Sequence, residues 1–358
     1  MENIDFDVII IGAGIYGASM AYSLSKYGLK IVLIEKETPG GAGSSKYSGG
    51  IVRVYDEDES LIANNLAGLY EFANWNSIGY PGNSPFFQTG LLYLLKNESV
   101  IRAKEIIERS CSDETELIES EQLIDNFPFL KNHTGDYLLY EKNSGYADVR
   151  LTIKNLIEGY KSNGGLLLEN CNVESAINND GNWSVKTTFA NLHSSVVVFT
   201  VGSSIRNFFP DLEVFTKSVP LTLISERETP FILPVIDEIN NVFTRPLNGE
   251  FFFCGTPGKH INEFPEQLPK YSEIELEDVL SKISKVNGKN YSANVINGFN
   301  GHDSYTNDCR PIYQFHKIFK GAYYLSGMSG RGFKSSLAVS KKATKEIIEY
   351  LQISNELK

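Results

Sequence analysis

The chain contains 358 residues, of which 42% are hydrophobic and 22% charged, and its formal net charge is −11. This length exceeds an average single domain, and the acidic charge makes nucleic acid an unfavourable partner because phosphate backbones are repelled. The four cysteines lack CxxC spacing, and no apolar run suits a secretion signal or a membrane span. We therefore expect a soluble, cytoplasmic protein of two domains or one large interleaved unit.

The first 35 residues predict a strand, a helix and a second strand. Residues 6–11 are apolar, largely β-branched and followed by a glycine, which is typical of a buried parallel strand. Residues 15–27 carry small and apolar side chains at helical spacing, and residues 30–35 form a second apolar run. The junction of the first strand and the helix reads Gly12-Ala13-Gly14-Ile15-Tyr16-Gly17, a GxGxxG pattern. This context predicts a dinucleotide-binding βαβ unit.

Each part of the glycine pattern has a physical role in that interpretation. Gly12 allows a tight turn, Gly14 lets the backbone approach a pyrophosphate, and Gly17 lets the helix pack closely on the strand. The start of the helix offers free N–H groups and a positive dipole to phosphates. Glu35 ends the second strand, where its carboxylate can accept hydrogen bonds from ribose hydroxyls and disfavours a 2′-phosphate. The motif alone does not distinguish NAD from FAD.

The rest of the chain predicts a mixture of helices and strands after a Gly/Ser-rich loop over 39–50. Between about 215 and 300 the strands alternate without intervening helices, which indicates an antiparallel sheet with one helix and a Pro-rich loop at 256–269. We expect helices at 59–76, 98–110, 119–125, 151–163, 273–286 and 335–351, and strands at 86–95, 166–169, 194–201, 219–226, 242–245, 250–254 and 321–326.

Five further segments carry a family resemblance. A Gly-Ser loop at 43–53 ends in an arginine, Gly-Tyr-Ala-Asp stands at 145–148, and an apolar strand ending in glycine stands at 196–202. Residues 305–312 read Tyr-Thr-Asn-Asp-Cys-Arg-Pro-Ile, and residues 325–334 read Leu-Ser-Gly-Met-Ser-Gly-Arg-Gly-Phe-Lys. Together with the first βαβ unit, these segments resemble the sarcosine oxidase/glycine oxidase group of the D-amino-acid-oxidase family.

The resemblance implies an α/β fold with a Rossmann-like, glutathione-reductase-type FAD-binding domain. An α+β substrate domain with an antiparallel sheet is interleaved with it. We expect the FAD-binding domain to comprise residues 1–80, 145–215 and 300–358, and the substrate domain to comprise residues 81–144 and 216–299.

The same resemblance implies that the cofactor is FAD and that it is bound without a covalent link. Relatives with covalent FAD carry a cysteine two residues before the tyrosine that matches Tyr305, and here that position is Asp303. Arg331 replaces the usual histidine of the loop that lies against the flavin. The expected cofactor-binding residues are Gly12, Gly14, Ile15, Tyr16, Gly17, Glu35, Lys36, Ser44, Ser45, Ser48, Gly49, Gly50, Val173, Thr200, Val201, Gly202, Gly327, Met328, Gly330, Arg331, Gly332, Phe333 and Lys334.

The substrate site follows from the same comparison of motifs. Arg53 and Lys334 match residues that hold a substrate carboxylate, although Arg53 could be an ordinary ion-paired residue and Lys334 a solvated helix start. Tyr305 matches an active-site tyrosine, with core packing as the alternative. The oxygen-activating lysine of relatives stands in a C-G-x-K context, which here reads Cys254-Gly255-Thr256-Pro257. Lys259 can take that role only if the loop is shifted, so oxygen and another electron acceptor both remain open.

Three functional hypotheses follow. In the first, an amino acid or N-alkyl amino acid binds through its carboxylate, transfers hydride to flavin N5 and leaves as an imine. In the second, the substrate is a 2-hydroxy acid or a polyol phosphate, with His260 as the base. In the third, the chain binds FAD but acts on a carrier-bound or macromolecular substrate, or serves as a non-catalytic partner, with the loop at 256–269 as a docking surface. The pattern leaves the oligomeric state open.

Overall fold

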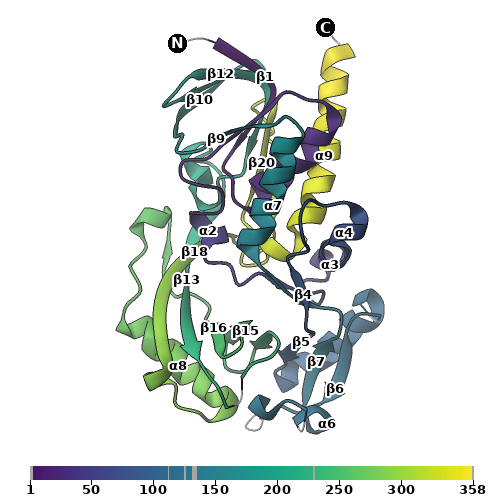
Figure 1. The fold of residues 1–358 in the computed structure, drawn as a ribbon, viewed down its shortest axis with the longest axis vertical. Helices are drawn as coiled ribbons and strands as arrows, with labels where there is room; N and C mark the ends of the chain where they lie inside the picture. The colour runs from purple at the N-terminus through teal and green to yellow at the C-terminus, as the bar shows by residue number, and fades with distance from the viewer. Residues whose placement is uncertain (1–2, 112, 125, 131–134, 229, 357–358) are drawn as a thin grey trace.

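The computed structural model describes residues 3–111, 113–124, 126–130, 135–228 and 230–356. Figure 1 shows two parts along the long axis, with both chain ends at the outer end of the upper part. The upper part contains the strand β1 and the long helix α9, and the lower part contains the helix α8. The chain passes between the two parts more than once, which is the interleaved arrangement expected.

The upper part is built on a sheet whose central strands run parallel. Its order is β10-β11-β12-β1-β2-β9, and β20 also pairs with β12 and carries β19. Val8 in the central strand pairs with Ile31 on one side and Val196 on the other, and its side chain is fully buried. The bounds of the strands are β1 Asn3–Ile11, β2 Ile31–Ile34, β9 Leu166–Leu168, β10 Val173–Asn179, β11 Asn182–Thr187, β12 Asn191–Phe199, β19 Ile312–Phe315 and β20 Ala322–Ser326.

The lower part is built on a mostly antiparallel sheet of order β17-β13-β16-β15-β14-β5-β7-β6, with β18 paired to β13. The face of this sheet away from the upper part packs against α8 through apolar residues such as Phe252 and Ile283. The bounds are β5 Leu91–Leu94, β6 Glu116–Glu119, β7 Tyr137–Glu141, β13 Val214–Ser225, β14 Val235–Asp237, β15 Val242–Asn248, β16 Phe251–Gly255, β17 Ile261–Asn262 and β18 Val295–Thr306.

A small third sheet and the helices complete the fold. The third sheet has the order β3-β8-β4, with β3 Ile51–Val52, β4 Phe86–Gln88 and β8 Gly145–Ala147. The helices α1, α7 and α9 form a common core with the parallel sheet. The bounds are α1 Ile15–Leu24, α2 Gly43–Lys46, α3 Ile62–Ala73, α4 Trp75–Ile78, α5 Val100–Ile106, α6 Glu121–Ile124, α7 Val149–Ser162, α8 Glu273–Asn287 and α9 Gly332–Glu356.

The expected fold class is confirmed, and several expected elements differ in detail. The predicted strand at 86–95 is two strands in two sheets, because Gly90 has a positive φ of 78° that turns the chain between them. The predicted helix at 59–76 is interrupted at Asn74, and the helix at 98–110 ends in a π-helical turn over Ile107–Cys111. Of the predicted helix at 119–125, residue 125 lies outside the described residues.

Within the described part of the chain, none of the helices combines the length and the apolar character that crossing a membrane requires.

Candidate functional site

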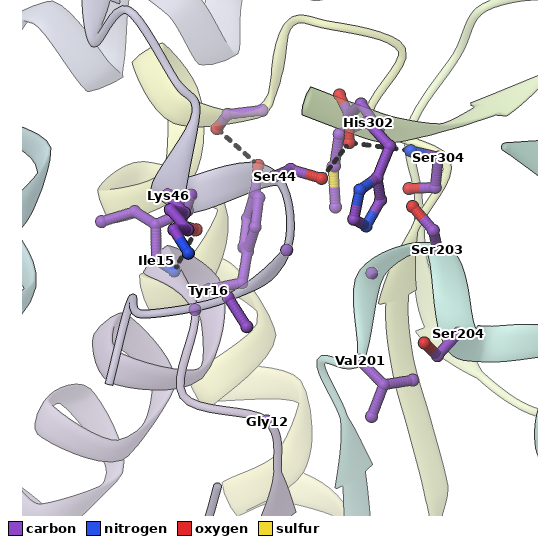
Figure 2. Close-up of a pocket in the computed structure, with 18 of the residues that line it drawn as sticks. Gly12, Ile15, Tyr16, Ser44, Lys46, Val201, Ser203, Ser204, His302 and Ser304 are labelled. Atoms are coloured by element: carbon purple, nitrogen blue, oxygen red, sulfur yellow. Dashed lines mark hydrogen bonds between the residues drawn. The ribbon is translucent and has the colours of Figure 1, made fainter. Parts of the chain in front are cut away.

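A cavity of about 1240 Å³ lies between the two parts of the molecule. Figure 2 shows Gly12, Ile15 and Tyr16 on one side of this space and Ser203, Ser204 and His302 on the other. The volume is larger than the roughly 300–1,000 Å³ typical of a pocket for one small ligand. The cavity can therefore take a dinucleotide together with a small substrate.

The glycine turn between β1 and α1 forms one end of the cavity. Gly12 has a φ of 96°, and a Cβ there would lie 2.7 Å from the carbonyl oxygen of Thr200. A Cβ on Gly17 would lie 1.8 Å from the carbonyl oxygen of Gly12, so Gly17 packs against the turn and does not line the cavity. The Thr200 hydroxyl donates to the Gly12 carbonyl at 2.8 Å and ties the turn to the end of β12. The close packing of the backbone therefore requires glycine at both position 12 and position 17.

Glu35 follows β2 and lines the cavity with only 6% of its surface exposed. Its carboxylate accepts hydrogen bonds from the backbone N–H groups of Ala13 at 2.7 Å and Glu37 at 3.0 Å. These bonds fix the carboxylate beside the glycine turn, and its remaining lone pairs can accept hydrogen bonds from sugar hydroxyls. Lys36 and Val173 line the same end of the cavity.

The Gly-Ser loop meets the turn and a second loop in the middle of the cavity. The N–H of Ile15, at the start of α1, donates to the Ser45 hydroxyl at 3.0 Å. The Ser44 hydroxyl donates to Asp303 at 2.9 Å, and the Gly330 N–H donates to the other Asp303 oxygen at 2.8 Å. Burial raises the pKa of Asp303, although these hydrogen bonds oppose the rise. Asp303 therefore connects the Gly-Ser loop to the loop before α9.

Elsewhere on the cavity wall, three cationic side chains surround one buried carboxylate. Lys334 Nζ lies 2.8 Å from Asp56 Oδ2, Arg53 Nη2 lies 3.6 Å from the same oxygen, and Arg331 Nε lies 3.6 Å from Oδ1. Arg53, Arg331 and Lys334 line the cavity, whereas Asp56 lies behind them with 1% of its surface exposed. Burial alone would raise the pKa of Asp56, but the three cations hold it well below its usual range.

The same arrangement leaves cationic hydrogen-bond donors facing the cavity. Arg53 Nη1 is buried and has no hydrogen-bond partner among the described residues, and its guanidinium lies 5.5 Å from the centre of the Tyr93 ring. Burial and the neighbouring Arg53 lower the pKa of Lys334 to about 8, although Asp56 opposes the change. The cluster of Arg53, Arg331 and Lys334 can bind an anion such as a carboxylate, because a charged donor without a partner gains most from a charged acceptor.

Sequence reasoning missed Asp56, although it stands three residues after Arg53 and is the charged residue nearest to it in the sequence. It also missed the hydroxyl groups of Ser203 and Thr256, which are buried, line the cavity and have no hydrogen-bond partner among the described residues. Tyr305 lines the cavity as expected and stacks on Phe215 with ring centres 5.9 Å apart.

Two expected catalytic residues lie elsewhere. Lys259 Nζ pairs with Asp278 of α8 at 2.7 Å, and 61% of the Lys259 side chain is exposed. His260 Nε2 lies 3.1 Å from Glu275 of the same helix, and 45% of its side chain is exposed. Neither residue lines the cavity, so the interpretation that placed them beside the substrate is corrected. Gly327 also does not line the cavity: its N–H donates to the Ser304 hydroxyl at 3.0 Å.

The remaining residues of the expected cofactor set line the cavity. They come from the start of α1, the Gly-Ser loop, the chain after β12, the loop before α9 and the first residues of α9. They are Gly14, Ile15, Tyr16, Ser48, Gly49, Gly50, Val201, Gly202, Met328, Gly332 and Phe333.

Comparisons with known proteins identify the family of the chain. The model of the DAO family, described as FAD dependent oxidoreductase, matches residues 7–346. N-methyl-L-tryptophan oxidase of Yersinia pestis (strain Pestoides F) is 26% identical over 216 residues, which cover 59% of this chain and 57% of the relative. The chain thus aligns with little more than half the length of the curated relatives it matches.

Solved structures with the same fold extend over nearly the whole chain. L-proline dehydrogenase from P. horikoshii superposes with a TM-score of 0.85 at 20% identity, covering 97% of this chain and 94% of the other. Glycine oxidase from Geobacillus kaustophilus superposes with a TM-score of 0.83 at 17% identity, covering 97% and 95%. At these identities the likeness shows a shared fold.

Proposed function

Because the chain belongs to the DAO family of FAD-dependent oxidoreductases, we propose that it oxidises the C–N bond of an amino acid or N-alkyl amino acid to an imine. The observation that carries this proposal is the cluster of Arg53, Arg331 and Lys334 around Asp56. It presents donors for a carboxylate on the wall of the cavity. The relative N-methyl-L-tryptophan oxidase supports the same class of substrate.

The cofactor in this proposal is FAD held without a covalent link. The cavity residues fit the group: Gly12 and Gly14 let the backbone approach a pyrophosphate, Glu35 is fixed for the ribose, and the Ser203 hydroxyl is buried without a partner. Asp303 is held by Ser44 and Gly330 and offers no thiol for a covalent bond. Acid precipitation tests this point, because non-covalent flavin moves wholly into the supernatant, whereas flavin remaining in the pellet would contradict the proposal.

The residues of the chain bind and orient the substrate in this reaction. Arg53 and Lys334 bind the substrate carboxylate with charge-assisted hydrogen bonds, each contributing about 1.5–3 kcal/mol. Asp56 keeps both side chains in place from behind, and Tyr305 shapes the wall beside the reacting carbon. When bound, FAD would supply the two-electron acceptor for a hydride from the substrate carbon, and water would hydrolyse the released imine.

Two observations bear on the alternative substrates. A hydroxy acid requires a base to remove its hydroxyl proton; His260, the residue proposed for that role, lies outside the cavity, whereas another histidine, His302, lines it. The loop at 256–269, considered above as a docking surface, contributes Pro257, Pro265 and Glu266 to the cavity wall. We therefore propose that this loop encloses the site and that the substrate is a free small molecule.

The test is anaerobic reduction of the flavin, observed as loss of its visible absorbance, with a panel of amino acids and N-methyl amino acids. We expect bleaching by members of the panel, and we expect Arg53→Met to weaken apparent substrate binding by about tenfold or more with the flavin content unchanged. The matched control is Arg227→Met, since Arg227 lies on the surface and pairs with Glu250. Absence of bleaching across the panel, or equal effects of both substitutions, would contradict the proposal.

A further inference from the structure

A continuous row of side chains crosses the lower sheet directly beside the carboxylate-binding cluster. Tyr93 of β5 pairs with Ile236 of β14, and Ile236 pairs with Phe243 of β15. Phe243 pairs with Gly255 of β16, which in turn pairs with Leu221 of β13. Directly paired residues project from the same face of a sheet. We call these five residues the cross-strand row.

The cross-strand row faces the cavity and not α8. Residues that alternate with its members, such as Leu92, Val235 and Cys254, belong to the core that includes the α8 residues. Ile236 and Phe243 line the cavity, and Tyr93 lies under the Arg53 guanidinium at 5.5 Å. Within the row, Ile236 and Phe243 therefore form part of the cavity wall, and Tyr93 connects the row to Arg53 of the carboxylate-binding cluster.

Phe243 has a defined position in this wall because its neighbour on β16 is a glycine. A Cβ on Gly255 would lie 2.3 Å from Phe243 Cζ, so the ring occupies the space that a side chain at 255 would fill. Atom Cε2 of the same ring lies 3.9 Å from where a Cβ of Gly49 would stand, in the Gly-Ser loop. Phe243 thus closes the space between the sheet and the cofactor loop.

The part of the wall formed by β13, β14 and β15 is apolar, whereas polar and charged lining residues of the same sheet, such as His302 and Asp303, stand on β18. Strands β13, β14 and β15 contribute Val219, Ile236 and Phe243 to the cavity lining among the described residues. A charged group against such a wall would lose its hydration without gaining a partner, whereas an apolar group would gain from burial.

We propose that the cross-strand row is the side-chain subsite of this enzyme, that it selects amino acids with an apolar side chain, and that Phe243 limits the length accepted. This inference rests on the proposed function, because the carboxylate of the substrate must occupy the cluster at Arg53. The side chain then extends from the cluster past Ile236 toward Phe243.

The experiment measures binding without turnover, by calorimetric titration of the FAD-loaded protein with straight-chain carboxylates from acetate to octanoate. Each methylene group that enters the subsite tightens Kd roughly fourfold, until the chain reaches Phe243 and the gain stops. Phe243→Ala moves this limit to longer acids, and Gly255→Ala moves it to shorter ones because the added methyl group displaces the ring. Phe253→Ala is the matched control, because Phe253 projects from the same face of β16 and does not line the cavity.

A Kd that does not depend on chain length would overturn the inference, as would equal limits in wild type, Phe243→Ala and Gly255→Ala. Tighter binding of a dicarboxylate than of a monocarboxylate of equal length would also overturn it and would assign the subsite to Arg331. The titrations can fail independently of the proposed function. Flavin reduction by amino acids tests the reaction, whereas the carboxylate titrations test the apolar wall. A chain-length dependence without any flavin reduction would reject the reaction and retain the subsite.

Discussion

Replacing Asp56 with asparagine removes the negative charge that Arg53, Arg331 and Lys334 all approach, while the shape of the side chain is kept. Lys334 and Asp56 lie 2.8 Å apart with 4% and 1% of their side chains exposed, so water screens their attraction very little. Removing one partner of a buried ion pair costs about 3–5 kcal/mol, because the other charge stays buried without compensation. We therefore expect Asp56→Asn to lower the free energy of unfolding by about 3–5 kcal/mol at pH 7.

Urea unfolding of the flavin-free and flavin-loaded protein measures this loss. Asp180→Asn is the control, since Asp180 and Lys320 form a pair at 2.6 Å in which 86% and 66% of the side chains are exposed. Water screens such an exposed pair, so its loss should change the stability very little. A loss below about 0.5 kcal/mol for Asp56→Asn would refute the reasoning, because that is the size expected of a surface substitution without a special role.

The loss of stability caused by Asp56→Asn depends on pH in a definite direction. The cations hold the pKa of Asp56 well below its ordinary value of 3.8. The folded state therefore releases the Asp56 proton more readily than the unfolded state, and the stabilisation is fully present above the ordinary pKa. The difference between wild type and Asp56→Asn should shrink as the pH falls below about 4.

Three other predictions concern the cavity. The affinity for a carboxylate ligand, measured by calorimetry, should fall as the pH rises through about 8, where Lys334 loses its proton. The Lys334→Met variant should bind the same ligand roughly 10- to 150-fold more weakly, and its affinity should not fall over this pH range. Gly17→Ala should cost about 1–3 kcal/mol or more of stability and reduce the bound flavin, because the new methyl group meets the Gly12 carbonyl; an unchanged absorbance ratio of flavin to protein would contradict this. Glu35→Gln should weaken FAD binding by about 1–3 kcal/mol in a fluorescence titration, whereas equal affinity would show that the ribose contact is absent.

The parts of the site that are local in sequence could be predicted from the sequence. The glycine turn and Glu35 lie within one βαβ unit, where strand, turn and helix signals are adjacent and their steric requirements are fixed. Arg53, Lys334 and Tyr305 were identified from motif resemblance, and the structure places all three in the cavity wall. Their roles in binding substrate are proposals.

Asp56 could not be identified as the centre of the cation cluster, because its contacts depend on the tertiary fold. Lys334 lies 278 residues away in the sequence, and nothing near Asp56 indicates that the start of α9 packs against it. Lys259 and His260 were misplaced for a related reason. Their partners Asp278 and Glu275 lie on α8, and the position of that helix against the sheet decides which way the preceding loop faces.

The strand β18 shows a limit of local patterns. Its sequence begins Val295-Ile-Asn-Gly-Phe-Asn-Gly, and Asn-Gly pairs are turn signals. Nevertheless it pairs with β13 from Val214↔Thr306 to Ile224↔Val295, because the neighbouring strand supplies a long hydrogen-bonding edge. The division of the chain into an FAD-binding and a substrate domain stays a prediction.

The most direct test of the central claim is product analysis after a single anaerobic turnover of the FAD-loaded protein with an amino acid that bleaches the flavin. Oxidation of the C–N bond and hydrolysis of the imine predict one equivalent of a carbonyl product and one equivalent of an amine or ammonia for each flavin reduced. Flavin reduction without release of an amine would contradict C–N oxidation. Reduction by 2-hydroxy acids alone would replace amino acids as the substrate class.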